Sequence, residues 1–193
     1  MYAREQLTTA VMADVPVLEA MISKLFQSTV KLDEVGLHHV LDALCKLSSE
    51  AMQVASLNRD PSYFAVHRLM ETGLMNIERL DVFWKPMTCH LLEVCAQSNA
   101  RLRDEAIVAL MMLVKTALKQ IENAPVDNRL KLQKLIVYPL RECSELSYED
   151  ARMHQMTCVL EILRDHGNAL HVQIWPDIIV AIGRIVSGGS SDN

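Results

Sequence analysis

The sequence predicts an all-α fold, an armadillo- or HEAT-like stack of antiparallel helix pairs. Two amphipathic segments, residues 82–98 and 99–118, follow each other with almost no break. The pattern that begins at Arg103 in the second segment returns 49 residues later at Arg152. A recurrence of about 40 to 50 residues, with one helix pair in each unit, is typical of α-solenoids. No sustained period-two alternation and no Asn-Gly or Asp-Gly turn predicts a strand.

Length and composition indicate one elongated helical domain. The chain has 193 residues, of which 50% are hydrophobic and 22% charged, so it can bury a core and is expected to fold. We expect the domain to cover residues 1–186 as part of a longer protein, followed by a flexible Ser- and Gly-rich tail at 187–193. The chain starts without a secretory signal, and its five cysteines are expected to be reduced core residues of a cytosolic protein.

The first two helices are predicted from their caps and apolar spacing. Asp14, shortly before a proline, is expected to cap a helix near residues 14–28. Asp33 is expected to cap the second helix. Apolar residues recur there at three and four from Leu37 to Ala55, which is the stripe of a helix with one buried face.

A polar segment, residues 58–62, interrupts the helical pattern. The residue before Pro61 is pushed out of the helical region, so this segment is predicted to be a loop. Ser62 then opens a third helix that extends through Ile77, with Gly73 as a weak point.

The next helix pair contains the longest apolar run of the chain, residues 106–114. Nine residues are far short of the roughly 20 that a membrane span requires. A helix that is apolar nearly all round is expected in the middle of a stack. We therefore place the helix of residues 99–118 at the centre of the fold.

The C-terminal part is expected to hold a basic helix near 127–143, after the break at Ala124-Pro125. Pro139 lacks a backbone donor and is expected to kink or end that helix. A further apolar segment at residues 174–186 predicts a last helix.

Between these two helices the sequence predicts another, over residues 148–166. Ser147, with Asp150 three residues later, resembles a capping box. Gly167 follows the last helical residue, a place that favours a left-handed conformation.

Charge is the main indication of a binding surface. The net charge of −5 argues against a nucleic-acid partner. Residues 99–141 nevertheless hold eight Lys or Arg against four Asp or Glu, which suits an acidic partner or an anionic membrane surface. An ordinary solvated face is the alternative. If the two helices that carry them are neighbours, six cations converge into one candidate patch: Lys115, Lys119, Arg129, Lys131, Lys134 and Arg141.

Residues suited to catalysis, cofactor binding or metal binding are not arranged in any known pattern. The chain has no G-x-S-x-G, no phosphate-binding G-x-x-x-x-G-K-[ST] and no G-x-G-x-x-G. His38 with Asp42 offers the start of an acid–base pair, but a solvated helix face explains both residues. The Cys and His residues lack the loop spacing of a zinc site and are expected in the core or on the surface: Cys89, His90, Cys95, His154 and Cys158. We predict no enzymatic activity, no cofactor and no metal.

Three segments, residues 37–45, 64–74 and 83–95, resemble the Mon-two proteins. These are large scaffolds of Golgi and endosome trafficking, related to the large Arf guanine-nucleotide exchange factors. The likeness extends over roughly residues 7 to 185, and it rests on the whole series of motifs. The segment is similar to the helical region that lies downstream of the Sec-seven domain in those exchange factors.

The resemblance implies an armadillo-like scaffold module of a protein in endosome-to-Golgi transport and Golgi homeostasis. It implies a cytoplasmic protein that is peripheral on trans-Golgi and endosomal membranes. Expected partners are a Dopey-type protein and an Arf-like small GTPase, for which the module would be a regulatory surface. Because these scaffolds lack the catalytic Sec-seven domain, the resemblance implies no catalytic residue. The alternative is direct binding of phosphoinositide or phosphatidic acid headgroups through residues 99–141.

Overall fold

The computed structural model describes the backbone of residues 2–187 and the side chains of residues 14–187 other than 123, 126 and 127. Eight α-helices, joined by short turns and 3-10 segments, make up this part of the chain. Their bounds are α1 Tyr2–Gln27, α2 Glu34–Ser56, α3 Phe64–Met75, α4 Leu80–Cys95, α5 Ala100–Gln120, α6 Val126–Cys143, α7 Glu149–His166 and α8 Trp175–Ser187. The described residues contain no strand, which confirms the predicted all-α class. Of the predicted tail, Ser187 ends α8 and the remainder lies outside the described residues.

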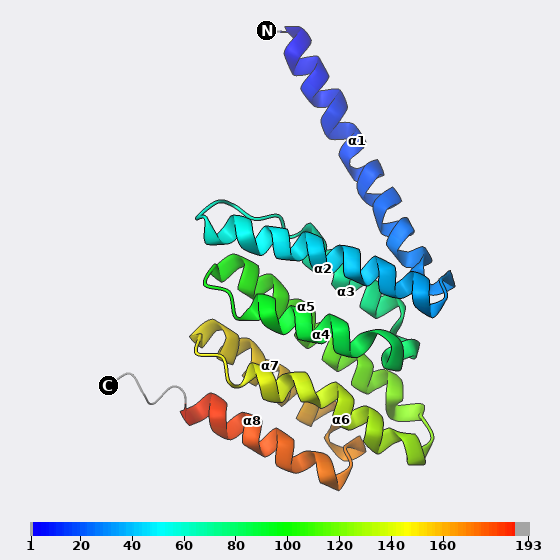
Figure 1. Ribbon diagram of the computed structural model, residues 1–193, viewed down its shortest axis with the longest axis vertical. Coiled ribbons are helices and arrows are strands. Elements are labelled where there is room, and N and C mark those ends of the chain that lie inside the picture. Colours follow the sequence, from blue (N-terminus) through cyan, green and yellow to red (C-terminus); the bar gives the residue numbers. More distant parts are fainter. Residues whose placement is uncertain (1, 188–193) are drawn as a thin grey trace.

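The helices form a two-layer stack (Figure 1). Helices α2, α4, α6 and α8 contact one another in order and make one layer, while α3, α5 and α7 make the other. Successive helices alternate in direction, so each short turn carries the chain from one layer to the other. This arrangement is the predicted α-solenoid, in which every unit contacts mainly its neighbours.

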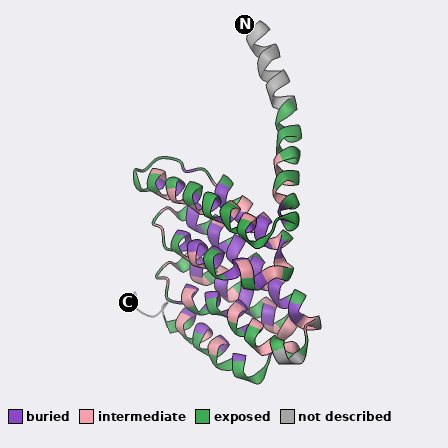
Figure 2. Ribbon diagram, turned by 45° about the vertical axis from the view of Figure 1, so that its right-hand side comes forward, coloured by how far each residue is buried: buried purple, intermediate pink, exposed green. Residues whose placement is uncertain are grey.

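Helix α5 lies at the centre of the stack and contacts α3, α4, α6 and α7. Its residues Ile107, Leu110 and Leu113 are completely buried. Buried residues are concentrated in the interior of the stack (Figure 2). The predicted central position of this helix is therefore confirmed. Across the described residues, helices long and apolar enough to cross a membrane are absent.

The end of α1 is attached to the stack through α3. The Arg68 guanidinium donates to Ser23 Oγ at 2.9 Å. The same group lies 5.6 Å from the ring centroid of Phe26, and the Phe26 ring meets Phe64 edge to face. A cation between two aromatic rings stabilises this junction by electrostatic attraction to the ring faces.

The predicted start of the first helix is wrong. Helix α1 begins at Tyr2 instead of near Asp14 and continues through Pro16. The predicted bounds of the helix near 127–143 are confirmed by α6, which continues past Pro139 to Cys143, so this proline does not end the helix. A proline removes one backbone donor but has a φ angle that suits a helix, so neighbouring turns can hold the helix together across it.

The predicted range of α7, residues 148–166, is confirmed within one residue, but the predicted caps at its two ends are wrong. Ser147 does not cap the helix, because the residue at the cap position is Tyr148, with no side-chain hydrogen bond. Gly167 has φ −52° and ψ −41°, a right-handed conformation, because the chain continues as a 3-10 turn over Gly167–Ala169. The Asp33 cap of α2 is confirmed, since its carboxylate accepts from Gly36 N at 2.7 Å.

Gly73 is a site of close helix packing and not a weak point of α3. A Cβ atom at this position would lie 2.7 Å from Leu113 Cδ2 and 2.8 Å from Met87 Sδ. The absence of a side chain at Gly73 therefore lets α3 approach the buried side chains of α4 and α5.

A buried arginine joins α5 to α7. Arg103 Nε donates to both carboxylate oxygens of Asp150, at 3.0 and 3.1 Å. Its Nη1 donates to the carbonyls of Gln97 and Ser98, and its guanidinium lies 3.8 Å from the ring centroid of Tyr148. The side chain is only 7% exposed, so these groups replace the water that a charged group would otherwise bind.

The 49-residue recurrence corresponds to equivalent places in successive units. Arg152 donates to the Ser147 carbonyl at 2.9 Å, as Arg103 does to the carbonyls before its own helix. Recurring arginines therefore tie each of these helices to the turn that precedes it.

A second ion pair between α5 and α7 joins Lys115 Nζ to Glu161 at 2.6 Å.

The central position of α5 predicts a large stability loss for Leu110→Ala. Removing this fully buried side chain should lower the free energy of unfolding by about 2 to 5 kcal/mol, because a cavity remains in a packed region. Met112→Ala on the same helix is the control, since Met112 is 40% exposed and should cost well under that amount. Urea unfolding measures both. Equal losses would contradict the central packing of α5.

The Arg103–Asp150 pair predicts a pH-dependent stability. Hydrogen bonds from Arg103 hold the pKa of Asp150 below its ordinary value. The carboxylate therefore stabilises the fold above about pH 4, and this contribution is lost as the pH falls through the lowered pKa. Asp150→Asn should cost about 1 to 3 kcal/mol at pH 7, and progressively less as the pH falls below about 4 to values under the lowered pKa of Asp150.

Urea unfolding of the wild type and of Asp150→Asn over this pH range tests the pair. Asp60→Asn, at an exposed loop position, should follow the wild type throughout. A loss from Asp150→Asn that does not change over this pH range would show that its charge is not involved.

Candidate partner-binding groove

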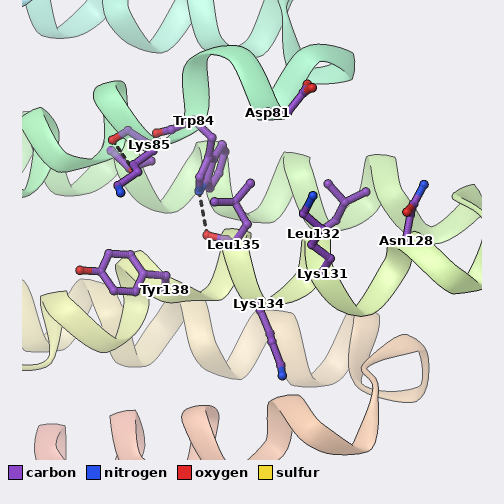
Figure 3. Close-up of a pocket in the computed structure, with 10 residues that line it drawn as sticks. Asp81, Trp84, Lys85, Asn128, Lys131, Leu132, Lys134, Leu135 and Tyr138 are labelled. Carbon is purple, nitrogen blue, oxygen red and sulfur yellow. Dashed lines mark hydrogen bonds between the residues drawn. The ribbon is translucent and has the colours of Figure 1, made fainter.

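A groove of about 690 Å³ lies between α4 and α6 (Figure 3). It combines an apolar interior with charged side chains at its edge. The residues that line it are Asp81, Trp84, Lys85, Thr88, Asn128, Lys131, Leu132, Lys134, Leu135 and Tyr138. We call this feature the α4–α6 groove.

Trp84 forms the floor of the α4–α6 groove. Its side chain is 1% exposed and its ring meets Phe83 edge to face. The indole Nε1 donates to the Leu135 carbonyl of α6 at 3.0 Å (Figure 3). The floor is therefore attached to the opposite wall by a hydrogen bond as well as by packing.

Pro139 explains why the Leu135 carbonyl is available to Trp84. In an α-helix this carbonyl would accept from the backbone N–H four residues later, but residue 139 has none. The indole N–H supplies the missing donor. A proline that the sequence marks as a helix breaker thus provides a specific contact between α4 and α6.

The walls of the α4–α6 groove are apolar and partly exposed. Leu132 and Leu135 are half-buried, and Tyr138 is 48% exposed. The nearby Glu142 carboxylate raises the pKa of the Tyr138 phenol, so the ring stays neutral at physiological pH. The apolar surface of these three side chains is therefore only partly covered by the described helices and remains accessible to a partner.

Three lysines surround this apolar surface: Lys85, Lys131 and Lys134. All three are exposed, and none forms an ion pair with a described side chain. Lys134 Nζ lies 3.3 Å from the amide oxygen of Gln173, a neutral acceptor. The groove therefore carries positive charge that the described carboxylates do not pair with.

Carboxylates also lie along the contact between α4 and α6. A second hollow of about 440 Å³ shares Asp81 and Leu132 with the groove and is also lined by Glu78. Acidic and basic side chains are therefore interspersed along the contact between α4 and α6, with Asp81 on the same side as Lys131 (Figure 3).

The six predicted cations are distributed over several surfaces. Lys131 and Lys134 line the α4–α6 groove, whereas Lys115 pairs with Glu161 of α7. The remaining three lie elsewhere: Arg129 donates to the Ala124 carbonyl at 3.0 Å, Arg141 lies 3.7 Å from Asp177, and Lys119 is exposed near the end of α5. A binding role for these six residues stays a prediction.

Sequence reasoning missed Lys85 and Trp84 as groove residues. Lys85 lies outside the basic region 99–141, and Trp84 reads as an ordinary core residue in its helix. The Trp84-Lys85-Pro86 triplet is noticeable in the sequence, but only the packing of α4 on α6 places it beside Lys131.

Three of the five cysteines and His90 are buried in the core, as predicted, whereas Cys45 and Cys89 are only partly buried. Burial raises the pKa of Cys143 and of Cys158 to about 12, so both thiols stay protonated. Burial lowers the pKa of His90, which favours the neutral imidazole. All five cysteines are free, and the described residues contain no group of three or more His, Cys, Asp or Glu side chains that could hold a metal ion.

Comparison with known proteins finds clear relatives. A protein of Drosophila melanogaster named Protein MON2 homolog is 49% identical over 177 residues, which is 92% of this chain and 10% of the relative. The Homo sapiens protein of the same name is 44% identical over 180 residues, 93% of this chain and 10% of the relative. Monensin-resistant homolog 2 of Caenorhabditis elegans is 28% identical over 179 residues, 93% of this chain and 11% of the relative. No family model matches the chain, and no solved structure matches it significantly.

The Trp84–Leu135 bond predicts a measurable coupling with Pro139. Trp84→Phe should cost about 1 to 3 kcal/mol, because it leaves the Leu135 carbonyl without a donor in a largely buried place. Pro139→Ala restores a backbone N–H that can reach the same carbonyl. Trp84→Phe should therefore cost less in the Pro139→Ala background, and unfolding of the four proteins in a double-mutant cycle measures the difference. Strictly additive losses would contradict the shared acceptor.

Proposed function

Over the segment that it covers, the chain belongs to the MON2 family, and from this we propose that it is a non-catalytic interaction module of a trafficking protein. The chain spans about a tenth of the length of the relatives it matches, so the proposal concerns one module of such a protein. We place the parent protein in endosome-to-Golgi transport and Golgi homeostasis, on the cytoplasmic side of trans-Golgi and endosomal membranes.

The observation that supports this function best is the α4–α6 groove. It joins exposed apolar side chains to three lysines that no described carboxylate pairs with. A recessed apolar surface with a charged edge is the usual composition of a protein-binding site, because the apolar part supplies affinity and the charges supply specificity. We propose that a protein of the trafficking machinery docks there, with a Dopey-type protein as the first candidate and an Arf-like small GTPase as the second.

The chemistry of the described residues supports a binding role rather than catalysis. The buried thiols are protonated, and the described carboxylates that contact a histidine or an arginine mostly join neighbouring helices, as Glu105 does with His67 and Asp104 with His154. Such pairs hold a stack in shape. A rigid stack presents a groove of constant geometry to a partner, which lowers the entropy cost of binding.

Direct binding to anionic lipid is the second candidate. The exposed cations Lys119, Lys131 and Lys134 favour it, because each lysine near an anionic membrane contributes about 1 kcal/mol. The pairing of Lys115 with Glu161 and of Arg141 with Asp177 reduces the charge available to a membrane. The recessed apolar part of the groove also suits a protruding side chain better than a planar membrane surface.

Two binding measurements on the purified 193-residue chain separate these functions. The first titrates a purified Dopey-type protein, and an Arf-like GTPase loaded with GDP or GTP, against the chain. Lys85→Glu combined with Lys131→Glu should weaken protein binding about tenfold or more, because both exposed charges line the groove. Lys46→Glu, an exposed position on α2, is the matched control and should bind like the wild type.

The second measurement is flotation with vesicles that contain phosphatidic acid or a phosphatidylinositol phosphate. We expect no flotation that depends on Lys115, Lys119, Lys131 and Lys134. Salt-sensitive flotation that is lost when these four charges are reversed, together with no binding to either protein, would replace the proposed function by lipid recognition.

A further inference from the structure

We propose that the α4–α6 groove recognises an acidic amphipathic segment of its partner, with apolar side chains against the walls of Leu132, Leu135 and Tyr138 and carboxylates at Lys85 and Lys131. This inference rests on the proposed function, since it takes the groove to be where a partner protein docks. It adds the chemistry of the segment that binds.

The apolar part of the argument comes from the floor and walls. A volume of about 690 Å³ falls within the range of about 300 to 1,000 Å³ that is usual for pockets that enclose a ligand. Leu132 and Leu135 are half-buried, and nearly half of Tyr138 is exposed. Covering these side chains removes apolar surface from water, so a leucine, phenylalanine or similar anchor is favoured over a polar residue.

The charged part of the argument comes from Lys85 and Lys131, because the Lys134 ammonium points away from α4 toward Gln173 (Figure 3). The whole chain has a net charge of −5, yet Lys85 and Lys131 line one groove in which the described carboxylate, Asp81, forms an ion pair with neither. Like charges that gather at one place repel each other until an anion arrives. Carboxylates on the bound segment would relieve this repulsion, whereas a basic segment would be excluded.

A helical segment fits these contacts most simply. The groove runs between two helices, and its lining residues on α6 recur at three and four from Asn128 to Tyr138. An amphipathic helix that lies in such a groove presents its anchors with the same spacing.

The test uses the full 193-residue chain and a fluorescently labelled synthetic helical peptide, with leucines at i and i+4 and glutamates beside them. Two further peptides replace either the glutamates by glutamine or the leucines by serine. Anisotropy should show binding of the first peptide, and binding of each control peptide weaker by about tenfold or more. Equal binding of the glutamine peptide would overturn the acidic requirement, and equal binding of the serine peptide the apolar one.

Variants of the chain locate the peptide. Lys85→Glu and Tyr138→Ser should each weaken binding about tenfold, and both replace exposed side chains that the fold does not need. Lys46→Glu and Lys119→Glu lie outside the groove and should leave binding within about twofold. Circular dichroism checks that each variant keeps its helices. Binding that is unchanged in Lys85→Glu and Tyr138→Ser would overturn the proposal.

Two comparisons separate this inference from the proposed function and from lipid binding. If the purified partner proteins bind the chain but the acidic peptide does not, the inference fails and the interaction function stands. If vesicles containing phosphatidic acid displace the peptide and bind with the same dependence on Lys85 and Tyr138, the groove is a lipid site and the inference also fails.

Discussion

Helix α5 is buried around most of its circumference, and the rest of the stack depends on the need to cover it. Ile107 and Ala109 are almost completely removed from water, and side chains two residues apart point to nearly opposite sides of a helix, so α5 requires neighbours on more than one side. Helices α3 and α7 cover it within its own layer, while α4 and α6 cover it from the other layer. The two-layer arrangement is the consequence, because no single layer can enclose such a helix.

Charged and polar contacts define how neighbouring units sit on this core. Arg103 is held by Asp150, by Tyr148 and by two loop carbonyls, so the spacing between α5 and α7 is set by directional bonds as well as by packing. Apolar contacts alone tolerate sliding, whereas a buried guanidinium that loses its carboxylate pays a large desolvation cost. The same logic applies to the indole of Trp84 and the Leu135 carbonyl.

The α4–α6 groove follows from this construction. Trp84 closes its floor because Pro139 leaves a carbonyl without its helical donor, and the helix pair therefore meets at a defined place. Lysines remain at the edge, where Lys85 and Lys131 face solvent without described carboxylates as partners, although Lys115 a layer away is paired. A binding surface and a folding contact thus share the same residues of α4 and α6.

Periodicity was sufficient to predict the helical class, the recurrence at Arg103 and Arg152, the loop at 58–62 and the central helix, because these features depend on neighbours a few residues apart along the chain. The start of the first helix near Asp14 and the cap at Ser147 were predicted wrongly, since a proline or a serine indicates only a local preference that the surrounding structure can override. The residues that line the groove come from two helices about 45 positions apart in the sequence. The basic region predicted from the sequence, residues 99–141, therefore included Lys131 and Lys134 but not Lys85. Local patterns therefore decided which segments are helices, whereas the contact between α4 and α6 decided which side chains share a site, because nothing within a single helix specifies what will lie opposite it.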